Sequence, residues 1–207
     1  MARSAQGAAV NGVIAILRGV TPAEVLDVAE ALLRGGVRVI EVPLNSPAPL
    51  ASIERLVQAL HGRAVIGAGT VLTPADADRV ADAGAQLVLA PNVDIAVVRQ
   101  ARARGLIAMP GVATPSEGFA ALAAGADALK LFPAEMLGPT VLKAWRAVFP
   151  PGTAMWPVGG VGLHNLAAFK AAGAAGAGIG SSLYSPGVAL DELERRARAL
   201  VQAWDDA

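Results

Sequence analysis

The sequence contains the stretch Thr114-Pro-Ser-Glu-Gly-Phe-Ala-Ala-Leu-Ala-Ala-Gly125, which Asp127-Ala-Leu-Lys-Leu-Phe-Pro133 follows after one residue. Thr114 and Pro115 are typical of a helix N-cap and the first helical residue, and Gly125 is typical of a helix end. The apolar run that follows has the length of a strand buried on both faces. This stretch therefore predicts a helix that leads directly into a buried strand.

The same alternation recurs along the chain. Further helix starts are indicated at Thr21-Pro22, Thr73-Pro74 and Gly138-Pro139, and further helix ends at Gly35, Gly84, Gly105 and Gly173. We expect strands at 13–17, 37–42, 64–67, 86–90, 106–109, 128–132, 154–158 and 177–179. We expect helices near 22–34, 48–60, 74–83, 93–104, 115–124, 138–148, 163–172 and 188–204.

Eight buried strands that alternate with eight helices favour a parallel sheet, and their number predicts an α/β fold of the small (β/α)8 TIM barrel type. A doubly wound sheet is the alternative. No linker or shift in composition interrupts the pattern, so we expect a single domain over residues 1–207. Its first residues, 1–11, are polar and rich in Ala and Gly, and we interpret them as a loose N-terminal leader.

Composition narrows the function. The net charge is zero, so nothing indicates a nucleic-acid partner or an anionic membrane, and no apolar run approaches the length of a membrane span. The chain has no cysteine, which excludes a disulfide framework and a thiolate nucleophile and fits a reducing, cytoplasmic location. No His, Asp and Glu cluster has the spacing of metal ligands, so we expect no metal.

Lys130 stands inside the apolar run 128–132. Burying an ammonium is costly unless the group is paired or functional. Desolvation lowers the pKa of a lysine, and a neutral amine is a good nucleophile toward ketones. Lys130 therefore indicates Schiff-base chemistry, and the alternative is a strand-end lysine that extends to solvent.

Active sites of such barrels lie where strands end. Glu41 ends its apolar strand and is a candidate general acid/base, although it could instead pair with Arg18 or Arg38 at the rim. The guanidinium fork of Arg18 suits a substrate carboxylate, with the same rim pair as its alternative. Thr70 follows the third strand, where its hydroxyl could bind that carboxylate or simply form a turn.

The turns Gly159-Gly160-Val161 and Gly180-Ser181-Ser182 follow the last two strands. In many barrels these loops hold a phosphate on backbone amides, because glycine lets the backbone approach an anion closely. Glycine pairs also serve ordinary turns. Two such turns on consecutive strands favour a phosphate site.

Together these residues resemble the 2-keto-3-deoxy-6-phosphogluconate/6-phosphogalactonate aldolases. The resemblance runs from about Val13 to Gly187. The motifs that carry it are Ile14-Ala-Ile-Leu-Arg-Gly19, Ile40-Glu-Val-Pro-Leu-Asn-Ser-Pro47, Ile66-Gly-Ala-Gly-Thr-Val71, Ala90-Pro-Asn92, Met109-Pro-Gly-Val-Ala-Thr114, Leu129-Lys-Leu-Phe-Pro-Ala134, Val158-Gly-Gly-Val161 and Gly178-Ile-Gly-Ser181.

The resemblance implies a class I pyruvate aldolase acting on a phosphorylated keto-deoxy sugar acid. It makes Lys130 the Schiff-base lysine, Glu41 the acid/base group and Thr70 a carboxylate ligand. It places phosphate contacts at Gly160, Gly180 and Ser181. It also implies a homotrimer and no cofactor.

One position separates two branches of this family. The phosphogluconate branch has Glu-Val-Thr-Leu-Arg-Thr after the second strand, and its arginine holds the pyruvyl carboxylate. Asn45 stands there in this chain, which resembles the phosphogalactonate branch, with Arg18 as the substitute cation and Asn45 as a candidate specificity residue. The alternatives are a phosphogluconate aldolase and a phosphate-metabolite-binding barrel without catalysis.

Overall fold

The computed structural model describes residues 12–207, and the predicted leader at residues 1–11 lies outside them. Over the described residues the strands are β1 (Val13–Ile16), β2 (Val39–Pro43), β3 (Val65–Gly69), β4 (Leu87–Leu89), β5 (Ile107–Met109), β6 (Gly111–Val112), β7 (Leu129–Leu131), β8 (Met155–Pro157) and β9 (Ala177–Ile179). The helices are α1 (Val25–Arg34), α2 (Pro49–Leu60), α3 (Pro74–Asp82), α4 (Ile95–Ala103), α5 (Pro115–Ala123), α6 (Ala134–Arg146), α7 (Leu166–Ala171) and α8 (Leu190–Asp206).

The strands form a closed parallel barrel. Six of them pair in the order β5-β4-β3-β2-β1-β9, and β6-β7-β8 form a second group. A bridge between Val158 and Gly178 joins β8 to β9, and the Lys130 amide donates to the Pro110 carbonyl at 2.9 Å between the two groups. The prediction of a small TIM barrel is confirmed, and the doubly wound alternative is wrong.

The predicted strand at 106–109 is the first half of a longer, interrupted strand. Only Pro110 separates β5 from β6, and proline has no amide hydrogen to donate to a neighbouring strand. β5 pairs with β4 before this proline, and β6 pairs with β7 after it. The interruption therefore marks the place where one barrel strand changes partners.

Two of the predicted threonine-proline helix starts are present in the structure, and one is not. The Thr73 and Thr114 side chains accept hydrogen bonds from the Asp76 and Glu117 amides, so both predicted N-caps are confirmed. The start at Thr21-Pro22 is wrong, because α1 begins at Val25. Glu24 Oε1 accepts hydrogen bonds from the amide and hydroxyl of Thr21, which closes a separate turn before the helix.

The sixth helix also differs from its prediction. It begins at Ala134 and not at 138, directly after the cis peptide bond that joins Phe132 to Pro133. Gly138 has a φ of 69°, so the helix is kinked there and resumes at Pro139. The predicted helix start at Gly138-Pro139 is therefore confirmed, because helical residues resume at Pro139 after the non-helical Gly138. The preceding helical turn, residues 134–137, was not predicted.

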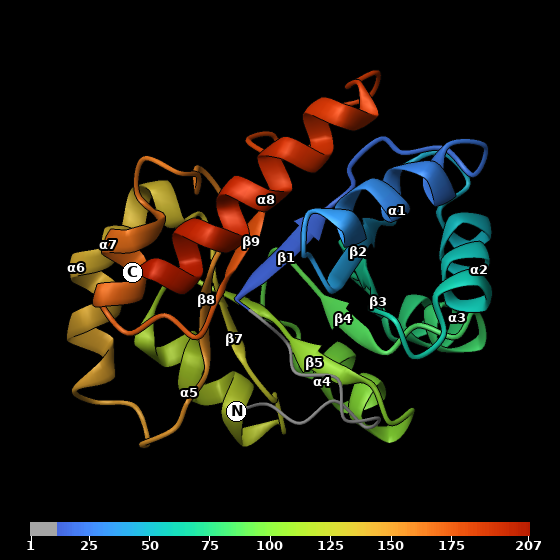
Figure 1. Cartoon of the computed structure of the whole chain (residues 1–207). Helices are drawn as coiled ribbons and strands as arrows, with labels where there is room; N and C mark the ends of the chain where they lie inside the picture. The colour runs from blue at the N-terminus through green and yellow to red at the C-terminus, as the bar shows by residue number, and fades with distance from the viewer. Residues whose placement is uncertain (1–11) are drawn as a thin grey trace.

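The strands are apolar on both faces because each face contacts its own core. Inside the barrel, side chains from successive strands form one cluster, comprising Ile14, Val39, Val65, Leu87, Leu89, Met109, Ala128 and Trp156. The larger cluster lies between the strands and the surrounding helices, which Figure 1 shows outside the barrel, with α8 alongside α1. This two-sided burial explains why the strand segments lack alternating polarity.

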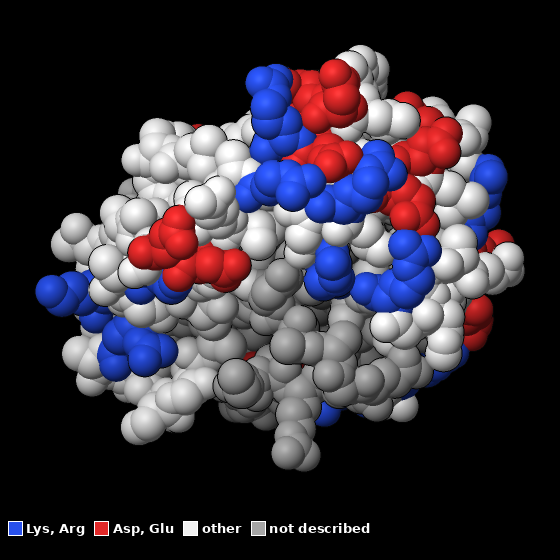
Figure 2. Space-filling view, viewed as in Figure 1, with Lys and Arg blue, Asp and Glu red and all other residues white. Residues whose placement is uncertain are grey.

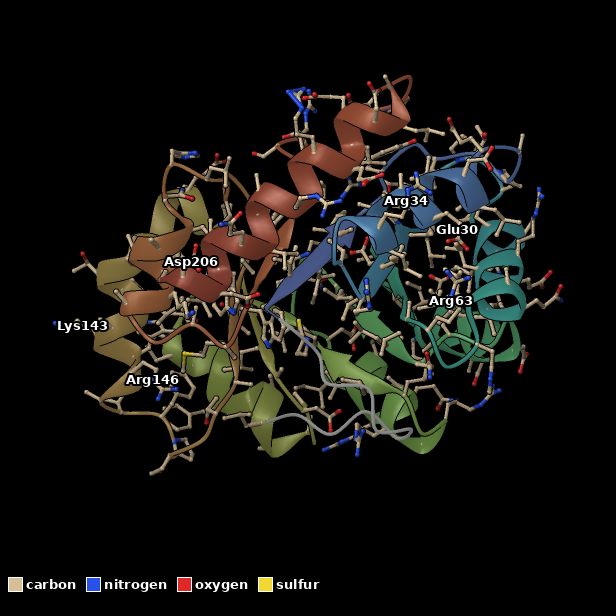
Figure 3. The ribbon with its side chains drawn as sticks, in the orientation of Figure 1. Glu30, Arg34, Arg63, Lys143, Arg146 and Asp206 are labelled. Atoms are coloured by element: carbon tan, nitrogen blue, oxygen red, sulfur yellow. The ribbon has the colours of Figure 1, made fainter. Side chains whose placement is uncertain are left out.

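Charged side chains of both signs mix on the outer surface. Figure 2 shows acidic and basic groups interspersed over α1 and α8, where Arg34 and Arg198 both pair with Glu194. Glu30 and Arg63 point toward each other between α1 and the end of α2, as Figure 3 shows, and form two hydrogen bonds. Over residues 12–207, no helix is both long and apolar enough to cross a membrane.

Candidate active site

A cavity of about 360 Å³ opens at the carboxyl ends of the strands. Every candidate site residue except Asn45 lines it. The lining residues are Ile16, Arg18, Glu41, Thr70, Pro91, Lys130, Phe132, Val158, Gly159, Gly160, Val161, Gly180, Ser181, Ser182, Tyr184, Ser185 and Pro186. The barrel thus brings together residues that are up to 170 positions apart, from Ile16 to Pro186.

Lys130 lies on β7 with 6% of its surface exposed, so the interpretation as a lysine extending to solvent is wrong. Its ammonium makes no ion pair with residues 12–207, and Nζ lies 4.6 Å from the centre of the Phe132 ring. Burial lowers the pKa of Lys130; the Glu41 carboxylate opposes this shift, and the Arg18 guanidinium adds to it. The site therefore favours the neutral, nucleophilic amine.

Glu41 lies on β2 and is 2% exposed. Burial raises the pKa of its carboxyl group to about 7, against the opposing charges of Lys130 and Arg18. Within the described chain, Oε2 has no hydrogen-bond partner and the carboxylate forms no ion pair, so the rim-pair interpretation is wrong. A carboxyl group that titrates near neutral pH is suited to taking and returning a proton.

Gly69 provides the space for this carboxylate. A Cβ atom built on Gly69 would lie 2.0 Å from Glu41 Oε1, so any other residue at this place in β3 would displace the acid. Sequence reasoning did not identify this requirement, because Gly69 and Glu41 become neighbours only when β2 and β3 pair. The run Gly67-Ala-Gly69 before Thr70 was the available signal.

Thr70 follows β3 in a left-handed backbone conformation, with a φ of 57°. Such a conformation is unfavourable for a side chain branched at Cβ and is typical of functional sites, where the surrounding structure maintains it. It places the half-buried Thr70 on the wall of the cavity. This geometry favours a binding role over an ordinary turn.

Asn45 lies outside the cavity lining and contacts Arg18 instead. The Arg18 guanidinium donates a hydrogen bond of 2.5 Å to Asn45 Oδ1. The neighbouring residues Gly19 and Ser46 are also joined, by a hydrogen bond of 3.0 Å from the Gly19 amide to the Ser46 hydroxyl. Asn45 therefore orients the cation at the mouth of the barrel.

The two glycine-rich turns, after β8 and β9, both line the cavity. Gly159 and Gly160 have φ values of 96° and 66°, which only glycine adopts readily. A Cβ on Gly160 would lie 2.6 Å from the Cβ of Glu135, whereas Gly180 has open space around it. The exposed Ser181 adds a hydroxyl donor, so this part of the cavity suits an anion such as phosphate.

The remaining wall includes residues that sequence reasoning did not select. Ile16, Val158 and Phe132 give the cavity an apolar side, and Tyr184 and Pro186 come from the loop after β9. Their signal was position alone, since each lies on or after a strand end. No group of three or more His, Asp or Glu side chains over residues 12–207 is arranged to hold a metal ion.

The family model for KDPG and KHG aldolase matches residues 6–197. The chain belongs to this family. It is 48% identical over 192 residues to a probable 2-dehydro-3-deoxy-6-phosphogalactonate aldolase of Rhizobium meliloti, covering 93% of this chain and 91% of that protein. It is 46% identical to the 2-dehydro-3-deoxy-6-phosphogalactonate aldolase of Escherichia coli, with coverage of 94% and 95%. A solved structure described as native KDPGal has a TM-score of 0.92 and 45% identity and covers 94% of each chain.

Membership in an aldolase family agrees with the arrangement of Lys130 and Glu41. Both are buried in one cavity, and their pKa values are shifted toward neutral pH. The match also extends across nearly all of the barrel, so the cavity is built from elements that the relatives share.

The stability of the Glu41→Gln variant relative to wild type is expected to rise as the pH increases from about 5 to about 8. The folded state holds the Glu41 proton up to a pKa of about 7, whereas the unfolded value is near 4.5. In that window the folded state binds more protons, so wild-type stability falls with rising pH. Denaturant unfolding of both proteins across this range measures the difference. Glu30→Gln is the control that should show no such trend, because Arg63 lowers the Glu30 pKa below 4.5 and this carboxylate is ionised in both states over the range. A wild-type-to-Glu41→Gln difference independent of pH would contradict the raised pKa.

Proposed function

We propose that this chain is a class I aldolase that cleaves 2-dehydro-3-deoxy-6-phosphogalactonate to pyruvate and glyceraldehyde 3-phosphate. The observation that carries the proposal is a buried amine of lowered pKa in the same cavity as a buried carboxyl group that titrates near neutral pH. This is the pair of groups that Schiff-base cleavage of a carbon–carbon bond requires. The names of the phosphogalactonate aldolases similar to this chain support the substrate.

The first steps form the Schiff base. The neutral Lys130 amine attacks the C2 ketone and gives a carbinolamine, which loses water to form an iminium ion. The iminium draws electrons from the C3–C4 bond. The lowered pKa of Lys130 increases the fraction of neutral amine, and the apolar side chains of Ile16, Phe132 and Val158 line the cavity around it.

Bond cleavage requires a base at the C4 hydroxyl. Glu41, directly or through a water molecule, takes that proton as the C3–C4 bond breaks, which releases glyceraldehyde 3-phosphate and leaves an enamine on Lys130. Glu41 then returns the proton to C3, and water hydrolyses the resulting iminium to pyruvate and the free amine. Lys130, Glu41 and water supply all the proton and bond changes of this cycle.

The two charged ends of the substrate are held by different groups on the cavity wall. We assign the carboxylate to the Arg18 guanidinium and the Thr70 hydroxyl, and the phosphate to Gly160, Gly180 and Ser181. A guanidinium fork can bind both carboxylate oxygens, and the glycine turns let backbone amides approach the phosphate. Binding both ends fixes C2 near Lys130.

Asn45 supports the phosphogalactonate substrate over the phosphogluconate epimer. It replaces the arginine of the phosphogluconate branch with a neutral side chain, and its contact with Arg18 fits the transfer of the carboxylate to the cation after β1. The relatives named for phosphogluconate are less similar in sequence, such as the Pseudomonas aeruginosa protein, which is 40% identical over 72% of this chain.

We further propose that residues 1–207 form one domain that assembles as a homotrimer in the cytoplasm. The family resemblance supports the trimer, and the absence of cysteine fits a reducing compartment.

Borohydride reduction in the presence of pyruvate is expected to attach the adduct to Lys130 alone. Lys143 lies on the outer side of α6 in Figure 3, and the Lys170 ammonium donates to the carbonyl of Trp204, so neither reaches the cavity. Mass spectrometry of peptides from the reduced protein locates the adduct. Lys130→Arg is the control that should remain unlabelled, and an adduct on another lysine contradicts the mechanism.

Turnover of the two C4 epimers is expected to favour phosphogalactonate over phosphogluconate. The expected preference in kcat/KM is about tenfold or more, since one well-placed hydrogen bond at C4 is worth about 1–2 kcal/mol. Coupled detection of released pyruvate measures both reactions. Equal kcat/KM values for the two epimers would still support an aldolase but would reject the assignment to the phosphogalactonate branch. Absence of cleavage with either epimer, with pyruvate still bound, would favour the barrel without catalysis.

A further inference from the structure

Tyr184 is the one tyrosine of the chain, and it is firmly tied to the proposed phosphate-binding turn. The amides of Leu183 and Tyr184 both donate to the Gly180 carbonyl at 2.9 Å. This turn places Tyr184 on the cavity wall with only 3% of its surface exposed. These hydrogen bonds couple the position of Tyr184 to that of Gly180 and its neighbour Ser181.

The hydroxyl of Tyr184 faces the loop that carries Arg18. It is buried, and within residues 12–207 it forms no well-aligned hydrogen bond, although the Glu24 carboxylate lies close enough to act as a weak acceptor. It lies beside Glu24, and burial followed by this carboxylate raises the pKa of Tyr184 to about 12. At neutral pH the phenol is thus a hydrogen-bond donor next to an acceptor.

Glu24 connects Tyr184 to the loop that contains Arg18. Its Oε1 accepts hydrogen bonds of 2.9 and 3.1 Å from the amide and hydroxyl of Thr21, three residues after Arg18. A second contact lies nearby, since a Cβ on Gly19 would be 2.9 Å from Pro186 Cγ. The loops after β1 and β9 therefore contact each other twice, through Gly19 and Pro186 and through Glu24 and Tyr184.

We propose that Tyr184 is a positioning residue that, through Glu24, sets the separation between the carboxylate-binding and phosphate-binding ends of the cavity. This inference rests on the proposed function. A buried hydroxyl beside a carboxylate is costly until it donates, so the two loops are most stable at the separation that completes this hydrogen bond. A substrate held at both ends gains affinity only when both anchors stand at the correct separation.

The test compares Tyr184→Phe with wild type on three ligands. Steady-state kinetics give kcat and KM for the six-carbon substrate, borohydride trapping gives the affinity for pyruvate, and calorimetry gives the affinity for inorganic phosphate. We expect KM for the six-carbon substrate to rise at least about threefold, the scale of one lost hydrogen bond. This loss should exceed the product of the losses for pyruvate and phosphate, because each half-ligand uses one anchor.

Two further variants make the test specific. Ser52→Ala removes another buried hydroxyl without a partner, from α2, and should leave all three affinities unchanged. Glu24→Ala removes the other partner of the same contact, on the β1 side. If both residues act together, the double variant should be no weaker than the weaker single variant.

A six-carbon KM for Tyr184→Phe equal to that of Ser52→Ala overturns the proposal. A loss equal to the product of the two half-ligand losses also overturns it, since Tyr184 would then act at one end. Fully additive effects of Glu24→Ala and Tyr184→Phe would separate the two residues and reject the route through Glu24. The proposed function fails separately, when wild type itself does not cleave the six-carbon substrate.

Discussion

The buried pair of Lys130 and Glu41 is the constraint on which this structure depends. An amine and a carboxyl group are removed from water at one end of an apolar barrel, and each makes the other less costly without forming an ion pair. A direct ion pair would hold both groups in their charged forms. Burial without direct contact instead raises the pKa of Glu41 and lowers that of Lys130, which favours a neutral nucleophile beside a proton carrier.

The barrel accommodates the pair with apolar packing in its interior and with free space at the carboxyl ends of its strands. Lys130 is in register with Gly111 on one side and Trp156 on the other, and Trp156 belongs to the interior cluster. Gly69 leaves room for the Glu41 carboxylate, and Thr70 directly after it adopts a left-handed conformation. The surrounding structure therefore maintains unfavourable local conformations at the wall of the cavity, as functional sites commonly do.

The barrel could be predicted from sequence because its strands are buried on both faces and its helices carry local start and end signals. Lys130 and Glu41 could be predicted because a charge inside an apolar strand is conspicuous. Thr21-Pro22 misled because Glu24 Oε1 accepts hydrogen bonds from the amide and hydroxyl of Thr21. Gly138-Pro139 correctly indicated a helix start, and only the helical turn at 134–137 before it was missed. Gly69 and Tyr184 were missed, since their importance comes from neighbours on other strands or loops that the linear sequence does not place beside them.

The pH dependence of imine formation tests the central claim most directly. The rate at which pyruvate is trapped on Lys130 should follow a pKa below the ordinary lysine value of 10.5 in wild type. It should follow a still lower pKa in Glu41→Gln, because that variant loses the carboxylate that opposes the effect of burial. A wild-type pKa at or above 10.5, or a pKa that rises in Glu41→Gln, would contradict the account.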